Sequence, residues 1–70
     1  MLTFENGKQI SPCIASKVRF ALGLKMTEPQ NDKTCSSEYW LKVVQRIGEL
    51  NNLNSESIDK ANGMYKTLIR

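Results

Sequence analysis

The sequence predicts a mainly α-helical fold with a short β-hairpin at its N-terminal end. Apolar residues recur at helical spacing in three segments, turn and capping residues separate those segments, and an Asn-Gly pair lies between two short extended stretches. The predicted elements are a hairpin over about residues 2–10 and helices over about residues 12–22, 37–50 and 55–69. A chain of 70 residues supports one domain, so we expect residues 1–70 to form a single small domain.

The hairpin prediction rests on Asn6-Gly7, because both central positions of a type I′ turn need a positive φ angle. With the turn at these two residues, Thr3 would face Ile10 across the two strands. A two-stranded hairpin alone is only marginally stable in water. Residues 1–10 should therefore pack on the helices or act as a dimerisation arm against another chain.

Ser11 and Pro12 indicate the start of the first helix, because serine caps helices and the N–H that proline lacks is unpaired at the first helical position anyway. Gly23 indicates its end. Its apolar face would contain Ile14, Val18, Ala21 and Leu22. The stretch of residues 26–35 is polar and contains a proline, so we predict a loop there.

The second and third helices are predicted from two further apolar stripes. Ser36 or Ser37 is expected to cap the second helix, and Trp40 is expected to anchor the core. The stripe of the second helix would consist of Trp40, Val43, Val44, Ile47 and Leu50, and that of the third of Ile58, Ala61, Tyr65 and Leu68. Gly63 costs about 1 kcal/mol relative to alanine in a helix interior, so we expect the third helix to bend or fray there.

The segment of residues 47–61 indicates a helix-turn-helix, in which two helices cross steeply through a short turn. Gly48 would allow the helices to approach closely, Asn52 would take the left-handed turn conformation, and Ser55 would cap the second helix of the pair. Over about residues 44–63 the chain resembles the helix-turn-helix segment of bacterial repressors and sigma-factor-like regulators. A small residue, a turn glycine and a branched apolar residue recur there at similar offsets, and this chain departs from the pattern where Asn52 replaces the glycine.

The resemblance implies DNA binding by a small bacterial, phage or plasmid protein that regulates transcription. The third helix would present side chains to base edges, namely Ser55, Glu56, Asp59, Lys60 and Asn62. Phosphate contacts would come from Lys42, Arg46, Lys66 and Arg70. A monomer with so few cations would bind weakly at physiological salt, so we expect a homodimer on a two-fold DNA site or assistance from a partner.

The charge distribution leaves a second function open. The net charge is +3, of which residues 36–70 carry +1 and residues 1–35 carry +2, so the half with the motif is not the more basic one. Glu56 and Asp59 would also approach phosphates unfavourably. The alternative is a small helical protein-interaction module that inhibits or adapts a host regulator or a nucleic-acid-associated protein. It would use the exposed edge of the hairpin or a basic surface of Lys17, Arg19 and Lys25.

The sequence lacks the residues that several kinds of catalytic, metal and phosphate-binding sites require. The absence of histidine removes Ser-His and Cys-His nucleophilic sites, two isolated cysteines fall short of a zinc site, and four dispersed glycines make no phosphate-binding loop. We therefore expect no enzymatic activity, no cofactor and no metal. No stretch has the features of a secretory signal or a membrane helix, so we expect a cytoplasmic protein with Cys13 and Cys35 reduced.

Overall fold

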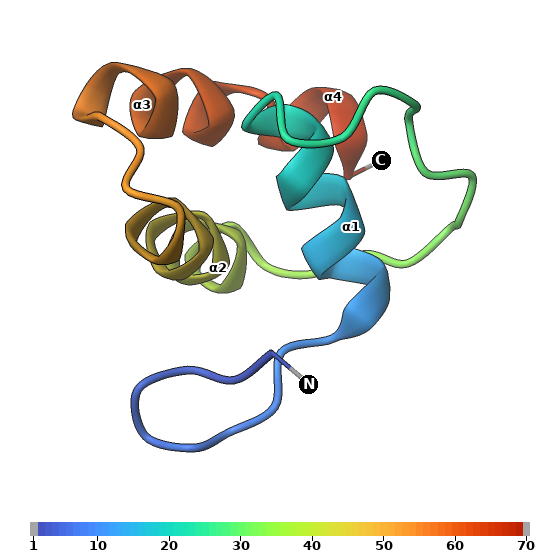
Figure 1. The fold of residues 1–70 in the computed structure, drawn as a ribbon. Coiled ribbons are helices and arrows are strands. Elements are labelled where there is room, and N and C mark those ends of the chain that lie inside the picture. The colour runs from blue at the N-terminus through green and yellow to red at the C-terminus, as the bar shows by residue number, and fades with distance from the viewer. Residues whose placement is uncertain (1, 70) are drawn as a thin grey trace.

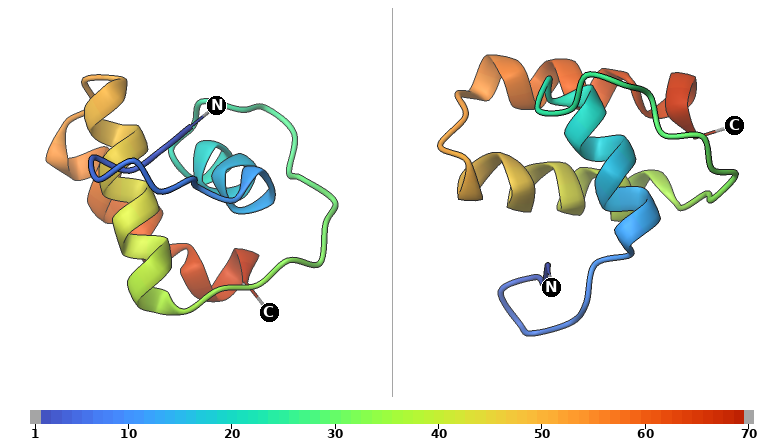
Figure 2. Two further views of the ribbon diagram at one scale, coloured as in Figure 1. Left: turned by 90° about the horizontal axis from the view of Figure 1, so that it is seen from below. Right: turned by 45° about the vertical axis from the view of Figure 1, so that its right-hand side comes forward.

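The computed structural model describes residues 2–69, and these contain four helices (Figure 1). They are α1 (Pro12–Ala21), α2 (Ser37–Leu50), α3 (Ser55–Gly63) and α4 (Tyr65–Leu68). Helix α1 packs against both α2 and α3, and α3 lies across α2. A long loop leaves the C-terminal end of α1 and wraps around that helix before α2 begins (Figure 2).

The core forms where the apolar sides of the helices meet. Trp40 on α2 is fully buried, and its indole N–H donates to the carbonyl oxygen of Ala61 on α3 at 3.1 Å. This bond satisfies the polar end of the side chain and ties α2 to α3. Around Trp40 lie Ile14 and Val18 of α1 and Val43, Val44 and Ile47 of α2. Leu50 was expected to continue this stripe, but it is 51% exposed, so the buried stripe ends one turn earlier.

The first two helices begin where the sequence indicates. Pro12 is the first residue of α1, although the side chain of Ser11 makes no capping hydrogen bond, and the backbone N–H of Ser11 instead donates to the Tyr39 hydroxyl at 3.0 Å. The Ser36 hydroxyl caps α2 by accepting from the N–H of Tyr39 at 3.1 Å. Tyr39 thus links the starts of both helices.

The β-hairpin prediction was wrong. Residues 2–69 contain no β-strand, and the N-terminal loop of residues 2–10 is closed by one isolated antiparallel bridge between Thr3 and Gln9. Gly7 has a φ of 87°, but Asn6 does not have the positive φ that a type I′ turn also requires. The N–H of Gly7 donates to the carbonyl oxygen of Phe4 at 3.0 Å, so the turn begins at Phe4, one residue earlier than expected. The pairing therefore shifts by one residue, and Thr3 does not face Ile10.

The N-terminal loop is docked on the helices rather than extended as an arm. The rings of Phe4 and Tyr39 meet edge to face at a centroid distance of 5.8 Å, and Ile10 is buried. The carbonyl oxygen of Thr3 accepts a hydrogen bond from Nε of Arg46 at 3.0 Å. Two backbone hydrogen bonds also join the sides of the loop, from the N–H of Phe4 to the carbonyl oxygen of Lys8 at 2.8 Å and from the N–H of Ile10 to that of Leu2 at 2.9 Å.

The third helix was predicted over residues 55–69, but it ends at Gly63 and a single turn, α4, follows. Gly63 lowers helix stability, and Met64 takes φ −87° and ψ 0° at the junction. The break redirects the chain so that Leu68 and Ile69 become buried against the core. The low helix propensity of glycine and the burial of these two side chains both favour the break.

Candidate nucleic-acid interface

The connection between α2 and α3 is a tight turn over residues 51–54. Asn52 is the only non-glycine residue of the described chain with a positive φ, 56°, which is the left-handed conformation that the sequence predicted. The N–H of Leu53 donates to the carbonyl oxygen of Gly48 at 3.0 Å, which closes the C-terminal end of α2. The cap of α3 is Asn54, whose side chain accepts from the N–H of Ser57 at 2.9 Å. The expectation that Ser55 is the cap was therefore wrong by one residue.

Helices α2 and α3 come close together at Gly48. A β-carbon placed on this residue would lie 2.8 Å from Cγ1 and 2.9 Å from Cδ1 of Ile58, which is shorter than real Cβ contacts allow. Figure 1 looks nearly along the axis of α2, whereas α3 lies across the picture, so the two helices cross steeply. The view from below in Figure 2 agrees, because α3 passes behind the upright α2. The two helices are therefore crossed and not aligned side by side.

The outer side of α3 carries most of the residues predicted to meet base edges. Ser55, Glu56, Asp59 and Lys60 are all exposed. Asn62 is half-buried, and its Oδ1 atom is buried without a hydrogen-bond partner. The exposed surface of α3 is thus of mixed charge, with two carboxylates near its start and one lysine in its last turn.

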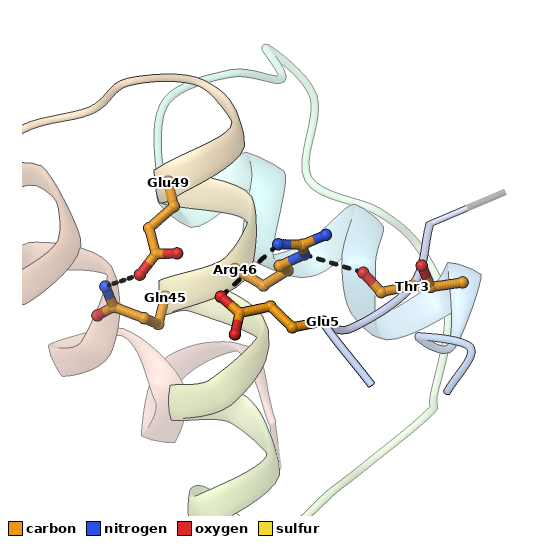
Figure 3. Close-up of polar contacts among 5 residues, drawn as sticks. All are labelled: Thr3, Glu5, Gln45, Arg46 and Glu49. Atoms are coloured by element: carbon orange, nitrogen blue, oxygen red, sulfur yellow. Dashed lines mark hydrogen bonds and ion pairs between the residues drawn. The ribbon is translucent and has the colours of Figure 1, made fainter. Parts of the chain in front are cut away.

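The cations predicted to contact phosphates are in different environments. Lys42 is exposed and pairs with Glu38 one turn away at 3.3 Å. Arg46 is directed to the N-terminal loop, where it bonds to Thr3 and lies 3.9 Å from the carboxylate of Glu5 (Figure 3). Arg46 is therefore already used inside the molecule. Lys66 is exposed but stands on α4, and Arg70 lies outside the described residues.

The alternative basic surface of Lys17, Arg19 and Lys25 does not form as expected. Arg19 and Lys25 are exposed, but Lys17 is only 5% exposed. Its ammonium group donates to the carbonyl oxygens of Lys33 at 3.0 Å and Leu68 at 3.1 Å. The sequence does contain a signal for this placement, because helical spacing puts Lys17 on the same side of α1 as the buried Ile14, Val18 and Ala21.

Other functional chemistry is sparse in the described part of the chain. Cys13 and Cys35 are free thiols, and no group of three or more acidic or cysteine side chains among residues 2–69 could hold a metal ion. Burial raises the pKa of the Cys35 thiol, and the nearby charge of Lys17 and the backbone N–H of Trp40 oppose that shift. None of the helices within residues 2–69 has the length and apolar character needed to cross a membrane.

Comparisons of the chain with protein-family models, with curated protein sequences and with solved structures found no match. The features of the chain that bear most on its function are the crossing of α2 and α3 and the residues exposed on α3.

Proposed function

We propose that this chain is a small DNA-binding regulator of transcription in which α2, the turn and α3 act as a helix-turn-helix. The observation that supports this most directly is the close contact of Gly48 with Ile58, which holds α3 across α2 with its outer side in solvent. A helix held in this way can enter the DNA major groove while the preceding helix lies over the backbone. Lys60 would donate to guanine, and Glu56 or Asp59 would accept from the N4 amino group of cytosine.

The proposed binding unit is a dimer on a two-fold DNA site. On and beside α3, Lys60 and Lys66 are exposed and lie outside the ion pairs of the described residues. Each phosphate neutralised contributes a slope of about −0.9 to the dependence of log affinity on log salt concentration. With Lys60 directed to a base, the one such contact from Lys66 gives one chain a slope of about −0.9, and two chains on one site a slope of about −2.

Fluorescence anisotropy with a duplex DNA pool, measured at two salt concentrations beside the solution mass, tests this proposal. Lys60→Glu should weaken binding by at least about tenfold, because it removes a base contact and adds repulsion. Lys8→Glu is the matched control, since Lys8 is exposed on the N-terminal loop, at the opposite end of the molecule from α3 (Figure 1). Equal losses in both variants, or no salt-dependent binding in the parent protein, would refute the proposal.

A second candidate function is a protein-interaction module that inhibits or adapts a host regulator or a nucleic-acid-associated protein. It is favoured by exposed apolar side chains beside Arg19 and Lys25, the two exposed cations of the predicted basic surface. Leu24 is 42% and Met26 is 99% exposed, and they lie next to Arg19 and Lys25 at the C-terminal end of α1 and in the loop after it. This mixed surface suits a partner with acidic and apolar residues.

Affinity capture from a nuclease-treated bacterial lysate separates the two functions. A protein retained by the parent chain and lost with Arg19→Glu and Lys25→Glu supports the interaction module. Retention in an untreated lysate that nuclease treatment abolishes contradicts it and favours DNA binding.

A further inference from the structure

We propose that the cleft beside Lys17 binds a small zwitterion that carries both a carboxylate and an ammonium group, as a free α-amino acid does. The cleft is open and has a volume of about 730 Å³, which lies in the range of small-molecule sites. It lies between α1, the end of α4 and the long loop, and its lining includes Lys17, Glu28, Asp32, Thr34 and Leu68. The proposal is independent of DNA binding by α3.

Lys17 supplies a positive charge to the lining of the cleft. Lys17 is 95% buried, and its ammonium group has three N–H donors, two of which bond to the carbonyl oxygens of Lys33 and Leu68. Within residues 2–69, no carboxylate oxygen lies within 4.0 Å of this ammonium group. A buried charge without an opposite charge is costly. The third N–H donor, and the absence of a carboxylate within 4.0 Å among residues 2–69, therefore favour an anionic oxygen in the cleft.

Two carboxylates form part of the wall of the cleft. Glu28 and Asp32 line it from the long loop, both are exposed, and neither forms an ion pair with another described residue. Two carboxylates would repel phosphate or a dicarboxylate, but they would attract an ammonium group. A ligand with a carboxylate toward Lys17 and an ammonium toward Glu28 or Asp32 satisfies both requirements.

The remaining lining specifies a polar ligand. Gln30 and Asn31 supply amide groups and Thr34 supplies a hydroxyl, so the cleft offers both hydrogen-bond donors and acceptors around the charged pair. Pro29 and Leu68 are the apolar members of the lining. Amino acids with small or polar side chains therefore suit this cleft better than those with large apolar ones.

The test is an NMR titration of the ¹⁵N-labelled full chain with glycine and L-glutamine. Acetate and methylammonium serve as matched controls, because each carries only one of the two charges of glycine. We expect saturable shifts in the amides of Lys17 and of residues 28–34 with the two amino acids. Acetate and methylammonium should bind at least about tenfold more weakly, because each lacks one charge-assisted contact.

Substitutions of Lys17 and of the two carboxylates of the cleft complete the test. Lys17→Met keeps the length of the side chain and removes its charge, and the double variant Glu28→Gln/Asp32→Asn changes only exposed side chains. Each should weaken glycine binding by at least about tenfold, and the double variant should then bind glycine no better than acetate. If Lys17→Met does not fold, the double variant decides the result alone. Absence of saturable shifts, shifts centred elsewhere, or equal binding of acetate and glycine would overturn the proposal.

Discussion

The contact between Gly48 and Ile58 gives the sharpest prediction about the helix crossing, through the substitution Gly48→Ala. In an ordinary helix interior this change stabilises by about 1 kcal/mol, because alanine loses less backbone entropy than glycine. Here the added methyl group would lie 2.8 Å from Cγ1 of Ile58, whereas ordinary contact begins near 3.4 Å. Ile58 or α3 must therefore move, and overpacking of this kind costs about 1–3 kcal/mol. We expect a net loss of about 1 kcal/mol in the free energy of unfolding.

A double-mutant cycle isolates the steric part of this effect. Ile58→Ala removes both Cγ1 and Cδ1 and should cost about 2 kcal/mol, since Ile58 is only half-buried. In that background Gly48→Ala meets no obstacle and should become stabilising by about 1 kcal/mol. The change of sign corresponds to a coupling energy of about 2 kcal/mol between the two positions.

Gly63→Ala provides the control for helix propensity. Gly63 ends α3, its φ is not positive, and a β-carbon there would have no neighbour within 4 Å. This variant should be stabilised by up to about 1 kcal/mol. Urea unfolding, followed by circular dichroism and by the fluorescence of the buried Trp40, measures all four variants. The steric conflict with Ile58 is refuted if Gly48→Ala alone stabilises the protein as much as Gly63→Ala does.

Three further predictions concern the caps, the N-terminal loop and the thiol. Asn54→Ala should cost about 1 kcal/mol of unfolding free energy, whereas Ser55→Ala should change it by less than about 0.5 kcal/mol, and equal costs in urea unfolding would contradict the capping assignment. Arg46→Met should cost about 1.5 kcal/mol and should increase hydrogen exchange in residues 2–10, and unchanged exchange there would show that its bond does not hold the loop. Cys35 should be alkylated half-maximally at a higher pH than a free thiol, because burial raises its pKa, and Lys17→Met should move that midpoint to still higher pH. A midpoint that stays in place or falls in Lys17→Met would contradict the role of the lysine charge.

The first two helices could be predicted because each depends mainly on local residues. The start of α1 at Pro12 and the full extent of α2 follow from caps and apolar spacing, and Asn52 took the turn conformation that its side chain tolerates. The N-terminal hairpin prediction failed because Asn6 does not take the positive φ of a type I′ turn and the turn begins at Phe4. Contacts to Tyr39 and Arg46 hold the loop on the helices.

The candidate site was less predictable because it depends on where charged side chains go after the helices have packed. Lys17 and Arg46 were expected on surfaces that contact a partner, but each bonds to backbone carbonyls from distant parts of the chain. Such contacts follow from the route of the irregular segments, which apolar periodicity does not describe. The spacing of Lys17 among buried residues of α1 was the one local signal for its burial.

The internal use of these cations constrains the proposed DNA binding. With Lys17 buried, Arg46 bonded to the N-terminal loop and Lys42 paired with Glu38, few cations remain to meet phosphates near α3. Lys60 lies one turn after Glu56 and directly after Asp59 on α3, so two carboxylates oppose its charge there. The crossing of α2 and α3 supplies a suitable shape, but one chain supplies too little positive charge for tight binding at physiological salt. Two chains on one DNA site would double the number of cations that meet phosphates. The proposed function therefore requires a dimer.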